Sequence, residues 1–78
     1  MIVKLSEMRP GQAGVVRQIA GGIGCQRRLA KLGIRPGVAL RVIHSAPFCG
    51  PVLIESLGVS VAVGRGMAAR VEVDLACA

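Results

Sequence analysis

Aromatic side chains are nearly absent from this sequence. Its 78 residues include one phenylalanine, Phe48, and no tryptophan or tyrosine, although 53% of the residues are hydrophobic. A core must therefore be packed from aliphatic side chains. Barrel-type proteins that bind single-stranded RNA or DNA stack bases on exposed aromatic rings. Because Phe48 alone could serve in that way, the sequence disfavours specific nucleic-acid binding.

Residue types that carry catalysis or bind metals are also scarce. One histidine, four carboxylates and three cysteines are present, and no two of them have a spacing known to build a site. The sequence therefore predicts no enzymatic activity, no catalytic residue and no cofactor. The odd number of widely spaced cysteines (Cys25, Cys49 and Cys77) predicts reduced thiols, of which Cys77, next to the last residue, is the best candidate for exposure.

One metal-binding alternative stays open. His44 and Cys49 lie five residues apart and, with help from Cys77, could form half of a site for a soft metal ion. A lone histidine at the end of a strand is more often a surface or hydrogen-bonded residue. We therefore assign no metal ligand.

Long apolar runs are missing as well. The longest is far shorter than the roughly 20 residues that span a bilayer. The first seven residues lack a charged region followed by a sustained apolar stretch, so no secretory signal is visible. We expect a soluble cytoplasmic protein. A chain of this length forms a single domain, which we place over residues 1–78.

Negative charge is absent from the middle of the chain, since no acidic residue occurs between Glu7 and Glu55. The net charge is +6, and the part from Glu55 onward is slightly acidic. One part of the surface should therefore be strongly positive, which attracts nucleic acid, anionic lipids, phosphates or an acidic protein face. The cations of the acid-free interval are Arg9, Arg17, Arg27, Arg28, Lys31, Arg35 and Arg41.

Glycine and proline are what the sequence has in plenty. Eleven glycines and four prolines favour many short elements joined by tight turns. In the first strand we expect Val15, Arg17 and Ile19 on one face, and we find no internal repeat. The expected strands cover residues 13–19, 38–43, 52–55, 59–63 and 71–75.

One short amphipathic helix is predicted at about residues 24–32. Apolar residues recur there at Cys25, Leu29 and Leu32, with offsets of four and three, while the basic residues fall on the other side. Gly33 follows the predicted helix at the position where a C-cap residue in the left-handed conformation is expected. With a possible helical turn in residues 64–69 before the last strand, the fold class is mainly β, a small five-stranded β-barrel. Its closure would hide the strand edges.

Three segments together resemble the FeoA family, the small cytosolic accessory proteins of bacterial ferrous-iron uptake. They are RRLAKLGIRPG at residues 27–37, APFCGPV at residues 46–52 and the opening KLSEMRPG at residues 4–11. The resemblance runs over essentially the whole chain and implies an SH3-like barrel without enzymatic activity. It also implies a partner, FeoB, a polytopic membrane Fe(II) transporter with a cytosolic GTP-binding domain. The resemblance thus implies that the chain meets a membrane only indirectly, through this transporter.

The sequence departs from the family pattern in two places. Family members commonly read Ala-Pro-Leu-Gly-Asp-Pro in the loop, whereas Phe48, Cys49 and Gly50 fill the three central places here and the acidic position is lost. Near the end, residues 64–67 read GRGM in place of a charged helical turn. Because of these departures, the resemblance does not determine which surface binds the partner.

The candidate partner-binding residues are the basic side of the predicted helix and one loop side chain. They are Arg27, Arg28, Lys31, Arg35 and Phe48. Because guanidinium groups pair well with carboxylates, we interpret the cations as docking an acidic face of the transporter's cytosolic GTP-binding part. The alternatives are a merely solvated surface, or an SH3-like regulatory or nucleic-acid-binding module of the metal-dependent repressor type. A homo-oligomer also stays open.

Overall fold

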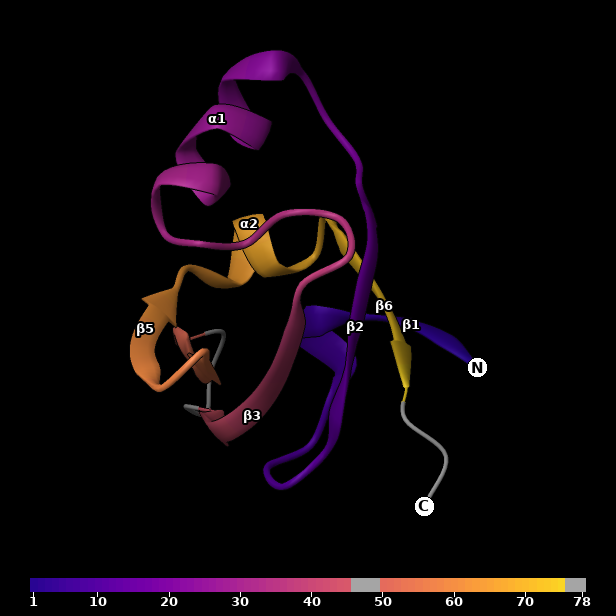
Figure 1. Cartoon of the computed structure of the whole chain (residues 1–78), viewed down its shortest axis with the longest axis vertical. Coiled ribbons are helices and arrows are strands. Elements are labelled where there is room, and N and C mark those ends of the chain that lie inside the picture. Colours follow the sequence, from indigo (N-terminus) through magenta and orange to yellow (C-terminus); the bar gives the residue numbers. More distant parts are fainter. Residues whose placement is uncertain (46–49, 76–78) are drawn as a thin grey trace.

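Six antiparallel strands form one sheet in the computed structural model, which describes residues 1–45 and 50–75 (Figure 1). The order in the sheet is β1-β6-β2-β3-β4-β5. Figure 1 shows helix α1 at one end of the molecule, joined to the end of β2. The elements are β1 (Ile2–Lys4), the 3-10 helix η1 (Leu5–Glu7), β2 (Ala13–Ile19), α1 (Ile23–Lys31), β3 (Ala39–Ser45), β4 (Val52–Ser56), β5 (Val59–Val63), α2 (Arg65–Ala68) and β6 (Val71–Leu75).

The mainly-β class, the helix before β3 and the helical turn before the last strand are confirmed. The expected number of five strands is wrong, because β1 adds a sixth. With three residues, β1 is too short to show an alternating pattern, and its pairing with β6 holds it in place. No helix within the described ranges is both long and apolar enough to cross a bilayer.

The expected closure of the sheet is also wrong. Within residues 1–45 and 50–75 the strand order is linear, so β1 and β5 form its two edges. The sheet curls around the core instead of joining its edges. Edge strands carry unpaired backbone groups, and here both are short, with three and five residues.

The predicted aliphatic core is present among the described residues. Leu5 from η1, Leu29 from α1 and Ile34 after α1 are fully or almost fully buried, together with inward-facing residues of β2, β3, β4 and β6. Two elements far apart in the sequence, η1 and α2, meet in this core. Each buried Val, Leu or Ile contributes about 1.5–3 kcal/mol relative to exposure, and the buried core among the described residues consists of aliphatic side chains and one methionine.

Bulges in β2 and β3 change which residues face the core. The register shifts between Val16 and Gln18 against β6, and between Val42 and His44 against β4. A bulge adds one residue to one strand, so the side chains beyond it change face. The predicted shared face of Val15 and Ile19 is therefore wrong, because Ile19 is buried with Val16 while Val15 is 44% exposed.

A short repeat underlies the pairing of β2 with β3, contrary to the expectation of none. Residues 9–16 and 35–42 share the pattern RPGxAxxV. In each copy the glycine has positive φ, +91° at Gly11 and +93° at Gly37, as a type II Pro-Gly turn requires. Each glycine N–H donates to the valine carbonyl of the other copy, Gly11 to Val42 and Gly37 to Val16, both at 2.8 Å.

The repeat gives the β2–β3 ribbon a local two-fold symmetry. Ala13 pairs with Arg41 as Ala39 pairs with Val15, and Gly14 faces Leu40 at the centre. Both bulges follow the repeated valine, so the symmetry extends beyond the eight shared positions. Five identities in eight residues are too few to stand out in the sequence, although the backbone repeats each contact.

A tight turn joins β4 to β5. Leu57 and Gly58 both have positive φ, 53° and 80°, which is the type I′ geometry of two-residue hairpins. Leu57 is 85% exposed and adopts a conformation that favours glycine or asparagine.

Arg65 ties three segments together at the start of α2. Its guanidinium group donates to the carbonyl of Gly50 at 3.1 Å, the carbonyl of Ser6 at 3.0 Å and the hydroxyl of Ser45 at 2.9 Å. The GRGM departure therefore supplies a structural arginine that links η1, the end of β3 and the start of the segment before β4.

Candidate docking surface around helix α1

Helix α1 is one residue offset from the predicted range and ends as its sequence predicts. Gly33, with φ +87°, donates its N–H to Ala30 O at 3.0 Å, and Ile34 donates to Leu29 O at 2.9 Å. These two bonds form a Schellman motif, with Leu29 and Ile34 both in the core. The helix is thus fixed at its C-terminal end and turned so that its basic residues face outward.

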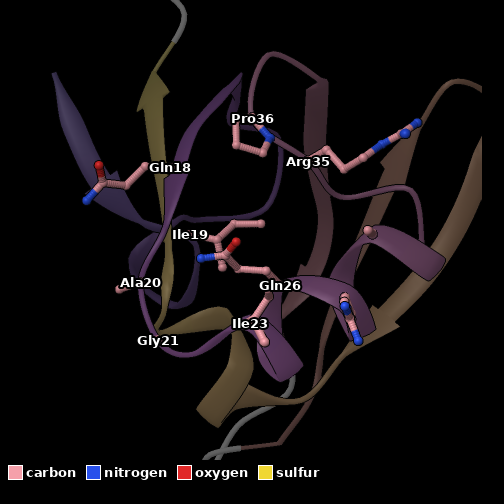
Figure 2. A pocket seen from close by; sticks show the side chains of 10 residues that line it. Gln18, Ile19, Ala20, Gly21, Ile23, Gln26, Arg35 and Pro36 are labelled. Atoms are coloured by element: carbon pink, nitrogen blue, oxygen red, sulfur yellow. The ribbon is translucent and has the colours of Figure 1, made fainter.

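A groove of about 640 Å³ lies on one side of α1 (Figure 2). We call it the α1–β2 groove. Figure 2 shows Ile19, Ile23 and Gln26 gathered near its centre, with Gln18 and Arg35 toward opposite sides. Its lining consists of residues 18–21 at the end of β2, Ile23, Gln26, Arg27 and Ala30 of α1, and Arg35 and Pro36 after the helix.

A second hollow, of about 600 Å³, lies on the other side of α1. It separates the helix from α2. Cys25 is half-buried in it, and two arginines, Arg28 and Arg70, line it. The remaining lining residues are Gly24, Gly66 and Met67.

The structure divides the predicted basic cluster in two. It brings Arg27 and Arg35 to the α1–β2 groove and Arg28 to the second hollow, while Lys31 is exposed and lines neither. Phe48 lies outside the described residues. Arg70 was missed by sequence reasoning, because it belongs to the slightly acidic part of the chain and only the fold carries it next to α1.

Positive charge around α1 is not neutralised from within the described part of the chain. Neither hollow is lined by a carboxylate there, and none of the cations around α1 has an ion pair within residues 1–45 and 50–75. By contrast, the ion pairs that are present join Met1 to Asp74 at 3.3 Å and Arg41 to Glu55 at 3.8 Å. The surface can therefore attract carboxylates from outside.

The metal-binding alternative gains no described partner. His44 is exposed near the end of β3, and Cys49 and Cys77 lie outside the described residues. In residues 1–45 and 50–75, no three histidine, cysteine, aspartate or glutamate side chains come together as a metal site would require.

Two kinds of sequence relative match the chain. The FeoA domain family model covers residues 3–75. A Methanocaldococcus jannaschii protein named as an Fe(2+) transport protein A is 36% identical over 70 residues, which are 90% of this chain and 83% of that protein. A Porphyromonas gingivalis fusion of Fe(2+) transport protein A with the Fe(2+) transporter FeoB is 29% identical over 73 residues, which are 94% of this chain but 9% of the fusion.

Solved structures share the fold. A crystal structure of iron uptake regulatory protein (FeoA) has a TM-score of 0.93 and 42% identity, covering 97% of this chain and 100% of that one. Stenotrophomonas maltophilia FeoA with zinc, described as a prokaryotic SH3 domain protein, gives 0.76 and 28%, with coverages of 92% and 89%. A manganese-dependent transcriptional repressor gives 0.88 and 25%, with coverages of 96% and 42%. These likenesses confirm the predicted SH3-like fold class.

Proposed function

The chain belongs to the FeoA family, whose model spans residues 3–75, and on that premise we propose that it docks onto the cytosolic GTP-binding part of a FeoB-type Fe(II) transporter. In this role it is a non-enzymatic accessory of ferrous-iron transport. The family resemblance inferred from residues 27–37, 46–52 and 4–11 is confirmed.

The fusion relative is the single observation that carries the proposal. In the Porphyromonas gingivalis protein, a segment similar to 94% of this chain is joined covalently to FeoB. Covalent linkage holds two partners at a high effective concentration. Without such a linkage, the same role requires a surface that binds the transporter, and the cations around α1 supply one.

Charge supports this position of the docking surface. Arg27, Arg28, Lys31, Arg35 and Arg70 surround α1 and have no ion pair within the described ranges. Arginine forks bind carboxylates in a bidentate way, and electrostatic complementarity raises association rates and fixes orientation. Phe48 remains a proposed contact from the loop.

Reversing charge on α1 tests this proposal. We expect Arg27→Glu with Arg28→Glu to weaken binding to the cytosolic part of the co-resident transporter by at least about tenfold, since two attractive pairs become repulsive. Isothermal titration calorimetry at low salt measures the affinity. Both side chains are exposed, so the melting temperature should change little.

The matched control is Arg9→Glu with Arg17→Glu, which changes the net charge equally at exposed positions that line neither hollow. This control should bind nearly as tightly as the wild type. Equal affinities of all three proteins at low salt would contradict a docking role for α1. Absence of binding by the wild type would contradict the proposal itself.

A second candidate function rests on the likeness to the manganese-dependent repressor, of which this chain covers 42%. A repressor-type module would act beside a DNA-reading helix-turn-helix unit, which the elements of residues 1–45 and 50–75 do not include. Retardation of unrelated DNA duplexes with steep salt dependence would favour this candidate.

A further inference from the structure

The α1–β2 groove combines an apolar floor with a charged rim. Ile19 at its base is 8% exposed, Ala30 is half-buried, and Pro36 adds an apolar wall. Ile23, in the first turn of α1, is 67% exposed and is among the larger apolar side chains left in solvent. Such a floor binds one aliphatic side chain of a ligand better than a flat polar surface would.

Two arginines approach this floor from different segments. Arg27 comes from α1 and Arg35 from the turn after it, and no carboxylate of the described residues lines the groove. Among the described residues, Glu72 is the side-chain carboxylate that contacts a lining residue, and it accepts a hydrogen bond from the Gln18 amide at 3.1 Å. The two arginines at the rim can therefore bind carboxylates, and these carboxylates must come from the ligand.

The chain's own carboxylates are already engaged. Glu7 accepts the Lys4 backbone N–H at 3.3 Å, Glu55 pairs with Arg41, Glu72 binds Gln18 and Asp74 binds the amino terminus. These four are all the aspartates and glutamates of the sequence. A second copy could offer only side chains that already contact their own chain, so a foreign acidic segment is favoured.

A nucleic acid is disfavoured as the occupant by the same geometry. Phosphates would meet the two arginines, but a base would find only aliphatic side chains on the floor of the groove and no aromatic ring for stacking. A peptide side chain of the leucine or isoleucine type gains free energy on that floor, because its apolar area leaves water.

We propose that the α1–β2 groove binds an extended acidic segment of the partner, with one aliphatic side chain over Ile19 and Ala30 and flanking carboxylates at Arg27 and Arg35. This inference rests on the proposed function for the source of the segment, which is the cytosolic part of the transporter. It goes beyond that function by assigning the groove and the chemistry of its ligand.

Four capped seven-residue peptides test the chemistry of the ligand without the transporter. Each reads Ser-Gly-Z-X-Z-Gly-Ser, with X either Leu or Ser and Z either Asp or Lys. Titration into the 15N-labelled full chain should shift the amide resonances of the groove residues with the Leu/Asp peptide. The Ser/Asp and Leu/Lys peptides should bind at least about fivefold more weakly, since each loses one of the two contributions.

Two matched pairs of variants test the protein side. Arg35→Gln should weaken the Leu/Asp peptide by at least about threefold, whereas Arg9→Gln, at the same position of the repeated Pro-Gly turn but outside the groove, should not. Ile23→Ser should weaken it as well, whereas Leu57→Ser, at another exposed apolar residue, should not. All four positions are exposed, so each variant should fold.

The possible results distinguish a failure of the groove assignment from a failure of the proposed function. Groove resonances that do not move with the Leu/Asp peptide, or that move equally with the Ser/Asp peptide, would overturn the inference. If the cytosolic part of the transporter binds the wild type, Arg35→Gln and Ile23→Ser equally well, the proposed function stands and the groove is not its site. If that part fails to bind while the Leu/Asp peptide binds in the groove, the ligand class stands and the transporter is not its source.

Discussion

Gly14 in β2 occupies a position where the neighbouring strand leaves no room for a side chain. A Cβ atom there would lie 2.5 Å from the Asp74 carbonyl oxygen and 2.7 Å from Cγ1 of Val73, both on β6. We expect Gly14→Ala to lower the free energy of unfolding by more than about 2 kcal/mol, because the paired backbone must move apart. Urea denaturation followed by circular dichroism measures this loss.

Gly24→Ala serves as the control for that substitution. Gly24 lies within α1, and a Cβ atom there meets nothing within 4 Å. Alanine should therefore stabilise the helix by about 0.5–1 kcal/mol. A Gly14→Ala protein as stable as the wild type would contradict the close approach of β2 to β6.

Arg65 is the second residue on which the fold depends strongly. We expect Arg65→Met to lower the free energy of unfolding by about 2–4 kcal/mol, since three oxygen acceptors lose a charged donor. Arg17→Met, at the exposed bulge of β2, removes the same charge and should cost less than about 0.5 kcal/mol. Thermal and urea denaturation compare the two. Equal losses would mean that the three bonds of Arg65 add no stability.

At the scale of elements, the two Pro-Gly turns are equivalent. Gly11 and Gly37 have φ of +91° and +93°, and a Cβ atom at either would meet nothing within 4 Å. Gly11→Ala and Gly37→Ala should therefore each cost about 1–2 kcal/mol of stability through the backbone alone. The double variant should lose the sum within about 0.5 kcal/mol, because the turns lie at opposite ends of the ribbon.

Unequal losses at the two turns in denaturant titrations would contradict this equivalence. A large loss at Gly11 with none at Gly37, for example, would mean that the second turn adopts another geometry in solution.

The elements were predictable where local chemistry determines them. Gly33 and the spacing of Leu29 fix α1 to within one residue, and the alternation in 59–63 and 71–75 predicts β5 and β6. The bulge after Val16 was not predictable, because it depends on how β2 pairs with β6. For the same reason β1, which is held by its partner strand, escaped detection.

At the scale of the whole molecule, charge pointed to the correct region but not to the arrangement within it. The acid-free interval predicts a basic surface, and Arg27, Arg28, Lys31 and Arg35 do lie around α1. Which side of the helix each one borders depends on how α1 packs against the end of β2 and near α2. Arg70 joins them although it lies 35 to 43 positions away in the sequence, a proximity that no local pattern signals.

The repeated RPGxAxxV segments have a consequence for how the chain finds its native state. When two molecules fold close together, a repeated segment of one can pair with a repeated segment of the other. This is possible because residues 9–16 of one molecule present the same turn and valine as residues 35–42 of the other. What favours the correct partner is the unlike centre of the ribbon, where Gly14 admits β6 closely and Leu40 fills the interior. Refolding at high protein concentration should thus yield domain-swapped dimers, and refolding at low protein concentration should yield monomers.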